Sequence, residues 1–380
     1  SLSKLENVNQ LRPSQAQRSI LLEHYQKGRF SDAEKLSLSI IQKFPKDQFG
    51  WKVLGAVLSQ IGRVTESLVA NQKSVEFAPL DAEAKNNLGG TLQKLVRLDE
   101  AEIIYRQAIA IKPDFAEVHF NLGNTLKELG RLNDSKASLS KAITLKPDYA
   151  EAYSNLAGTL KELNRFDEAE ASLRQAIMLK PDFTNAHYNL GNLLKELRRF
   201  EEAEAIYRQA IRLKPDYAEA HFNLGNTLKE LSRFNDAEAS LRQAIMLKPE
   251  YSSAKHMLAA LTGNTTETAP LDFVEGLFDN YASKFEDALV NKLEYKIPKV
   301  IAEMIIKDSE FDFLGSIMDL GCGTGLFGIE IKQMCEHLEG IDLSKKMLNK
   351  AKKKNVYNKL IKQDILDYLS NAILNFDYFI

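Results

Sequence analysis

The stretch HFNLGNTLKEL occupies residues 119–129 and returns unchanged at residues 221–231. The two copies begin 102 residues apart, which is three times 34, and weaker copies stand at the 34-residue steps between and beyond them. A fixed period in this range is typical of repeat arrays, in which each unit buries its apolar face only against its neighbours. We therefore expect most of the chain to form one extended array and any chemistry to lie outside it.

Three sets of residues recur with this period and fix its phase. Two sets are small residues and the third is proline: Gly55, Gly89, Gly123, Ala157, Gly191, Gly225 and Ala259; Ala33, Ser67, Ala101, Ser135, Ala169, Ala203 and Ala237; Pro45, Pro79, Pro113, Pro147, Pro181, Pro215 and Pro249. Leu122, Leu126 and Leu129 stand at helical spacing within one unit, so each unit is predicted to be two antiparallel helices. The prolines end the second helices, and Asp148 and its equivalents suit the N-cap of the next unit.

These residues resemble the tetratricopeptide repeat over about two-thirds of the chain. The resemblance implies an all-α solenoid whose first helices line a concave groove for a protein or peptide. One position of five consecutive first helices holds an amide: Asn87, Asn121, Asn155, Asn189 and Asn223. Amides offer a donor and an acceptor to an extended peptide, and a similar ladder belongs to the peptide-binding superhelix of O-linked N-acetylglucosamine transferase. The alternative is that these asparagines cap or bridge adjacent units.

Three histidines also recur in phase with the repeats. His119, His187 and His221 share the fourth position of their units, where Trp51 and Tyr153 also stand. Residues a whole repeat or more apart are too distant to chelate one ion. We therefore interpret these histidines as packing residues and expect no metal site.

Beyond the array the 34-residue period ends, and apolar strand-like segments alternate with helical ones. SIMDLGCGTG (316–325) runs from an apolar strand into a glycine-rich turn, and a second strand finishes at Asp342. Residues 360–365 and 376–380 read as a third and a fourth strand. Strands alternating with helices predict a parallel, doubly wound α/β sheet.

The glycine turn is the predicted chemical centre. Gly321, Gly323 and Gly325 let the backbone approach a ligand at the tip of the first strand. Their spacing is GxGxG, whereas dinucleotide fingerprints have GxGxxG. Asp319 stands two residues before the first glycine of the turn. Asp342 ends the second strand, 17 residues after Gly325, and a carboxylate at this place can accept hydrogen bonds from ribose hydroxyls.

Together these features resemble the class I S-adenosylmethionine-dependent methyltransferases, joined here to a tetratricopeptide array as in a bacterial group of such enzymes. The resemblance implies S-adenosylmethionine as cofactor, with Asp319 and the turn at its amino-acid end and Asp342 at its ribose. The remaining cofactor residues that it implies are Cys322 within the turn, Leu343 and Met347 near the adenine, Asp364 at the adenine amino group, and Tyr281 closing over the site. A Rossmann-like domain without a nucleotide and an NAD-linked oxidoreductase remain the alternatives.

The resemblance also implies a seven-stranded sheet in the order 3-2-1-4-5-7-6, of which the sequence shows four strands. We therefore expect a truncated methyltransferase domain, incomplete at the C-terminus, that binds cofactor without turning over. We name no catalytic residue, because we expect the acceptor half to be missing. The alternative function is a protein-interaction scaffold with a non-catalytic methyltransferase-like remnant.

Bulk properties predict a cytoplasmic protein. The net charge is −2, and the lysine run at 345–354 is interpreted as a solvated helix face, so we expect no nucleic-acid partner. The apolar runs never reach membrane-spanning length, so we expect no membrane either. Two cysteines form neither a disulfide framework nor a zinc spacing. The predicted organisation is an N-terminal segment 1–13, seven units over 14–251, a capping helix 252–261, a linker 262–270 and a methyltransferase part 271–380.

Overall fold

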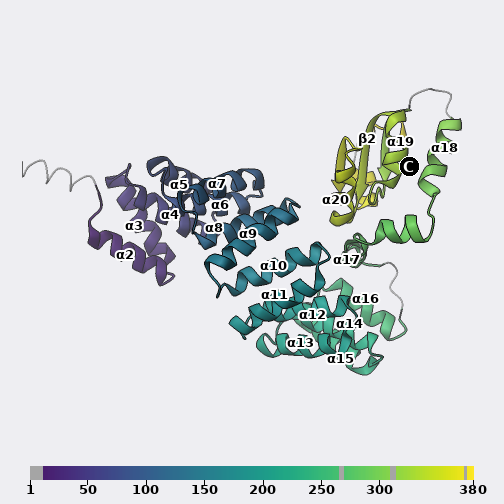
Figure 1. Cartoon of the computed structure of the whole chain (residues 1–380), viewed down its shortest axis with the longest axis horizontal. Coiled ribbons are helices and arrows are strands. Elements are labelled where there is room, and N and C mark those ends of the chain that lie inside the picture. The colour runs from purple at the N-terminus through teal and green to yellow at the C-terminus, as the bar shows by residue number, and fades with distance from the viewer. Residues whose placement is uncertain (1–11, 265–268, 309–313, 372–374) are drawn as a thin grey trace, which may run out of the picture. The chain divides into compact units, whose positions relative to one another are not determined.

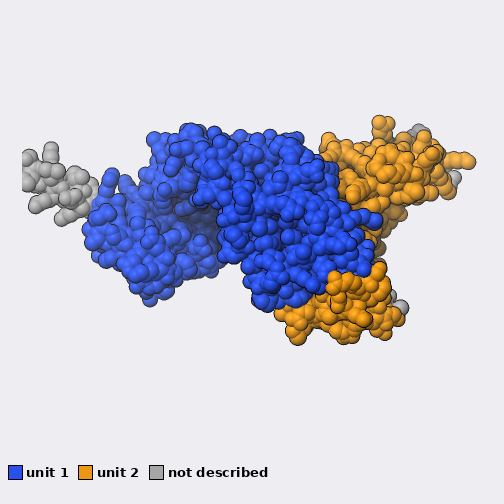
Figure 2. Space-filling model, turned by 60° about the horizontal axis from the view of Figure 1, so that its bottom comes forward, with its two compact units in different colours: residues 1–231 blue, residues 232–380 orange. Residues whose placement is uncertain are grey.

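The computed structural model describes residues 12–264, 269–308, 314–371 and 375–380. The chain divides into two compact units, Ser1–Leu231 and Ser232–Ile380 (Figure 2). Residues 1–11 of the predicted N-terminal segment and residues 265–268 of the predicted linker lie outside the described residues. Each unit is considered by itself below.

Unit 1 is a stack of paired antiparallel helices, which confirms the predicted all-α array (Figure 1). The first helices of the pairs start at 34-residue intervals from α4 onward. They are α2 (Gln15–Gln26), α4 (Gln48–Gln60), α6 (Ala82–Lys94), α8 (Ala116–Glu128), α10 (Ala150–Glu162), α12 (Thr184–Glu196) and α14 (Ala218–Glu230). The second helices are α3 (Phe30–Lys43), α5 (Val64–Phe77), α7 (Leu98–Ile111), α9 (Leu132–Leu145), α11 (Phe166–Leu179) and α13 (Phe200–Leu213).

Glycines in the first helices make room for large side chains of the second helices. A Cβ added to Gly89 would lie 2.5 Å from Cε1 of Tyr105, whose side chain is fully buried. A Cβ on Gly123 would lie 2.6 Å from Cγ of Leu139. The predicted role of these small residues in close helix packing is therefore confirmed.

The predicted N-cap role of Asp148 is wrong. The N-cap of α10 is Tyr149, which makes no side-chain capping bond and instead packs its ring against Phe120, with the ring centroids 4.9 Å apart. In that part of the array, this position serves ring packing instead of capping. Where the same position holds an aspartate, as at Asp47 and Asp81, its carboxylate does cap the following helix.

Unit 2 contains the parallel sheet. It begins with α15 (Phe234–Leu247), α16 (Ser252–Leu261), α17 (Leu271–Tyr281), a π-helical turn η1 (Asp287–Lys292) and α18 (Ile297–Asp308). The sheet and its helices follow as β1 (Leu314–Leu320), α19 (Leu326–Ile331), a 3-10 turn η2 (Lys332–Met334), β2 (Cys335–Asp342), α20 (Lys345–Lys354), β3 (Lys359–Lys362), α21 (Ile365–Asn371) and β4 (Tyr378–Phe379). The strands are all parallel in the order β3-β2-β1-β4, which confirms the predicted order of the first four strands.

The core of this sheet is apolar on both sides of β1. Leu314 and Ile317 of β1 and Leu338 of β2 are buried together with Ala302 of α18 and Ile331 of α19. Ile317 and its neighbour Met318 point to opposite faces of the strand and are both buried, so both faces of β1 are covered.

Helix α17 packs against two other elements of unit 2. Its Asp272 accepts a hydrogen bond of 3.0 Å from the Ser253 hydroxyl of α16, and its Asp279 accepts one of 2.6 Å from the Ser344 hydroxyl beside α20. These bonds place the C-terminal end of α17 next to the turn between β2 and α20. Within the described ranges, none of the helices has both the length and the apolar run needed to cross a bilayer.

Candidate functional site

A tight turn follows β1 and reaches the end of β2. Gly321, Gly323 and Gly325 have positive φ angles of 78°, 53° and 83°, which glycine adopts without strain. The amide N–H groups of Gly321 and Cys322 both donate to the carbonyl oxygen of Ile341, at 2.9 Å each. The turn therefore lies across the carboxyl ends of both central strands.

Asp342 ends β2, and its carboxylate fixes the turn to that strand. Oδ2 accepts a hydrogen bond of 2.9 Å from the amide of Gly323, and Oδ1 accepts one of 2.7 Å from the amide of Ser344. Burial raises the pKa of Asp342, and the two amide donors oppose this rise. A carboxylate has about four acceptor sites, so Asp342 retains at least one for a ligand hydroxyl.

Asp319, near the end of β1, is the other acidic residue at this edge. Its side chain is buried, and burial raises its pKa to about 6. The Tyr357 hydroxyl donates a hydrogen bond of 2.6 Å to Oδ2 of Asp319, which lowers this pKa, whereas the nearby carboxylate of Asp342 raises it. The turn and the two acids thus meet at one place, as the sequence predicts.

Tyr357 is a residue of this site that sequence reasoning missed. It precedes β3, and its ring lies against three glycines. An added Cβ would lie 3.0 Å from the ring at Gly325, 2.5 Å at Gly328 and 2.9 Å at Gly340. Gly328 and Gly340 could have indicated a large side chain packed here, since neither glycine belongs to the turn motif.

Two of the other predicted cofactor residues lie in the β2–α20 segment. Leu343 is half-buried in the turn, and Met347 is fully buried on the inner face of α20. Cys322 is buried within the glycine turn, and burial together with Asp319 and Asp342 raises its pKa. Its thiol therefore stays protonated at neutral pH.

The last two predicted residues lie at the ends of neighbouring elements. Asp364 follows β3, where Oδ1 accepts hydrogen bonds from the amides of Leu366 and Asp367 at the start of α21, at 2.9 and 3.1 Å. Tyr281 ends α17 with 39% of its surface exposed, and its ring stands edge-on to Phe285. In the described part of the chain, neither side chain makes a hydrogen bond to Asp319 or Asp342.

The glycine turn and its acids suit the polar parts of S-adenosylmethionine. Free acceptor sites on Asp342 match ribose hydroxyls, and a buried carboxylate at Asp319 matches an ammonium group. The residues present therefore fit this cofactor.

The asparagine ladder of unit 1 is partly engaged within the array. Three of its members donate through Nδ2 to an amide oxygen of the preceding repeat: Asn121 to Asn86 at 2.9 Å, Asn155 to Asn124 at 2.8 Å, and Asn223 to Asn192 at 2.9 Å. Asn87 is half-buried and Asn189 is exposed. The Nδ2 atoms of these three asparagines therefore bridge adjacent repeats, as the alternative interpretation predicts. Peptide binding by the ladder stays a prediction.

The three histidines make the same contact in each of their repeats. The Nε2 atoms of His119, His187 and His221 lie 2.9, 3.0 and 3.1 Å from the carbonyl oxygens of Pro113, Pro181 and Pro215. Trp51 donates in the same way to Pro45, at 2.9 Å. The position is therefore a packing position, and the described residues hold no cluster of three metal ligands.

Protein-family models match both the repeat array and the C-terminal part of the chain. The tetratricopeptide family described as the cilia and flagella-associated protein 70 C-terminal domain matches residues 53–270, and a methyltransferase domain family matches residues 317–380. None of the curated proteins matches the chain.

Solved structures resemble the chain in the array. The APC/C hetero-tetramer Cut9–Hcn1 matches with a TM-score of 0.55 and 16% identity, over 63% of this chain and 48% of that one. Pseudomonas aeruginosa pilF matches with a TM-score of 0.50 and 21% identity, over 56% of this chain and 97% of that one. At these identities the likeness concerns the fold alone. The chain belongs to the tetratricopeptide family of the cilia and flagella-associated protein 70 C-terminal domain, and a methyltransferase-like domain follows the array.

Proposed function

We propose that the chain carries the cofactor-binding part of an S-adenosylmethionine-dependent methyltransferase, and that its repeats recruit a protein or peptide. One observation supports this most strongly: Asp319, the 321–325 turn and Asp342 meet at the carboxyl ends of β1 and β2. Ligands of open parallel sheets bind at this edge. We further propose that the array gives way to the enzyme part across residues 262–270.

Each residue of the site has a distinct proposed task. Asp342 accepts hydrogen bonds from the ribose hydroxyls through the acceptor sites that Gly323 and Ser344 leave unused. Asp319, held by Tyr357, binds the ammonium group of the amino-acid end beside the glycine turn. The bound cofactor supplies an electrophilic methyl group, and the protein contributes by holding both reactants in place.

The remaining cofactor residues form the rim of the proposed site. Leu343 borders the adenine with Met347 beneath it, and Asp364 accepts from the adenine amino group. Tyr281 covers the cofactor from the end of α17, which the Asp279–Ser344 bond holds beside the β2–α20 turn.

Hydrogen exchange read by mass spectrometry tests the cofactor site. We expect S-adenosylhomocysteine to slow exchange in segments 316–325 and 339–347 and to leave the repeats unchanged. Asp342→Ala should abolish this protection, and Asp287→Ala, which alters an exposed acid of the same unit, should keep it. Unchanged exchange at saturating ligand would contradict the cofactor assignment and favour the scaffold alternative.

The recruiting role of the array has its own test. Asn121 and Asn155 donate to neighbouring amides through Nδ2, and their side-chain Oδ1 atoms accept no hydrogen bond within the described chain. These oxygens can accept from a peptide backbone. A displayed library of random dodecapeptides should yield binders whose affinity falls on Asn121→Ala with Asn155→Ala. The exposed Asn133 of α9 provides the control, Asn133→Ala. A library without binders would contradict peptide recruitment.

A further inference from the structure

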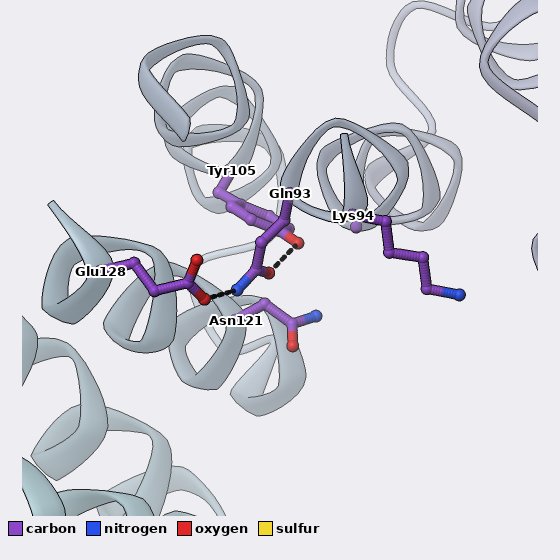
Figure 3. A pocket seen from close by; sticks show the side chains of 6 residues that line it. Gln93, Lys94, Tyr105, Asn121 and Glu128 are labelled. Atoms are coloured by element: carbon purple, nitrogen blue, oxygen red, sulfur yellow. Dashed lines mark hydrogen bonds between the residues drawn. The ribbon is translucent and has the colours of Figure 1, made fainter. Parts of the chain in front are cut away.

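Unit 1 contains a cavity of about 410 Å³ among α6, α7 and α8 (Figure 3). Its lining residues are Gly90, Gln93 and Lys94 of α6, Tyr105 of α7, and Asn121 and Glu128 of α8. Asn121 is a member of the asparagine ladder, so the cavity lies on the face of the proposed peptide groove.

Gly90 leaves space at the cavity, since a Cβ added there would meet only the Tyr105 hydroxyl, at 3.6 Å. Three repeats later the same position is Asn192, which receives the hydroxyl of Tyr207 at 2.7 Å and the amide of Asn223 at 2.9 Å. Tyr207 corresponds to Tyr105 in the same way. The side-chain amide of Asn192 therefore fills the space that stays open at Gly90.

Each side-chain amide or ammonium around the cavity already donates at least one hydrogen bond. Gln93 donates through Nε2 to Oε1 of Glu128 at 2.8 Å, and its own Oε1 receives the Tyr105 hydroxyl at 3.5 Å. The Nδ2 atom of Asn121 donates to the preceding repeat. Lys94 donates to the hydroxyl and carbonyl oxygens of Ser59, at 2.7 and 3.1 Å, and Figure 3 shows its chain directed away from the other lining residues.

Two acceptor atoms of the lining residues are free. Within the described residues, Oε2 of Glu128 and Oδ1 of Asn121 have no hydrogen-bond partner. Carboxylates also lie close by: burial raises the pKa of Tyr105, and the charges of Glu117 and Glu128 raise it further. Free acceptors beside carboxylates suit a ligand that carries several N–H donors and a positive charge.

We propose that the cavity at Gly90 binds the side chain of an arginine or lysine from a recruited peptide, with Glu128 and Asn121 as its acceptors. This inference rests on the proposed recruitment of a peptide by the array. It adds the class of side chain that the peptide must supply at α6–α8.

The test uses a capped amino acid, so that it does not depend on finding the natural partner. Nα-acetyl-arginine amide is titrated into the full chain and followed by saturation-transfer NMR, with Nα-acetyl-norleucine amide as the uncharged control. We expect saturable binding of the arginine probe alone. Absence of saturable binding, or equal binding of norleucine, overturns the inference.

Two glycines at the same position of different repeats give a matched pair of variants. Gly90→Asn places in the cavity the residue found at Asn192, and a Cβ there meets only the Tyr105 hydroxyl, at 3.6 Å. Gly158→Asn is the control, because at that site a Cβ would meet the flexible end of Lys127. We expect Gly90→Asn to weaken arginine binding at least about tenfold and Gly158→Asn to leave it unchanged. Equal effects of the two variants overturn the inference.

A second variant guards against misfolding of Gly90→Asn. Glu128→Gln keeps an oxygen for Gln93 and removes the charge, so it should weaken arginine binding several-fold without loss of helix content. The peptide library separates this inference from the proposal on which it rests. Binders without basic residues would contradict the cavity assignment but agree with peptide recruitment. An absence of binders would contradict recruitment, whatever the result with the arginine probe.

Discussion

The hydroxyl of Tyr357 donates a hydrogen bond of 2.6 Å to the carboxylate of Asp319, which is buried at the end of β1. The two residues are 38 positions apart in the chain, and the bond joins β1 to the segment before β3. Burial holds the pKa of Asp319 at about 6, and the hydroxyl keeps it from rising further. This pair therefore couples the proposed cofactor site to pH.

The first prediction concerns the pH dependence of this pair. An unfolded aspartate ionises near pH 3.8, whereas folded Asp319 ionises near 6, so its contribution to stability is present at pH 4 and lost as the pH rises through 6. Tyr357→Phe raises the folded pKa further. We expect the variant to cost less than about 1 kcal/mol at pH 4 and about 1.5–3 kcal/mol at pH 8, where the bond is to a charged group.

Chemical denaturation with exchange read at residues 314–325 measures this effect. Tyr295→Phe is the control, since Tyr295 is an exposed tyrosine of the same unit. A cost for Tyr357→Phe that is the same at pH 4 and pH 8 would contradict the account.

A second prediction concerns the space around the Tyr357 ring. Gly328→Ala puts a Cβ 2.5 Å from Cζ and Oη of Tyr357, so we expect unit 2 to lose about 1–3 kcal/mol of stability. Gly276→Ala in α17 meets no atom within 4 Å and should be neutral or stabilising by up to about 1 kcal/mol. Denaturant titration of the two variants decides, and equal effects would count against the ring's fixed position.

A third prediction uses two adjacent glycines of α6. Gly89→Ala drives a Cβ into the buried ring of Tyr105 and should destabilise unit 1 by about 1–3 kcal/mol. Gly90→Ala meets only the Tyr105 hydroxyl, at 3.6 Å, and should gain up to about 1 kcal/mol from helix propensity. Opposite signs in urea denaturation are the expected result, and a shared sign would refute the packing argument.

A fourth prediction concerns the packing histidines. His119→Trp should change stability by less than about 1 kcal/mol, because Trp51 makes the equivalent bond to the carbonyl oxygen of Pro45. His119→Ala loses both the bond and the packing, and should cost about 2 kcal/mol. Addition of EDTA should leave the thermal unfolding of the wild type unchanged. A lower melting temperature in EDTA would restore the metal interpretation.

The sequence predicts the parts of this fold that depend on local or periodic patterns. The phase of Gly89, Gly123 and Gly191 predicts where two helices touch, because a fixed period repeats the same contact in every unit. The order of β1 to β4 was predicted from the resemblance to class I methyltransferases, which rests on the glycine turn. The Tyr357–Asp319 bond could not be predicted, because it depends on how the segment before β3 docks under the turn. Bridging by Asn121 and Asn155 was only the alternative prediction, and their partners could not be named, because these depend on the angle at which the repeats stack.

Calorimetric titration of the full chain with S-adenosylhomocysteine tests the central claim most directly. The account predicts one saturable site, about 10–100-fold weaker binding by Asp342→Ala, which removes hydrogen bonds to a charged acceptor, and unchanged binding by Asp287→Ala. No saturable heat from a chain whose segment 314–325 is protected from exchange, or equal binding by Asp342→Ala, would contradict it.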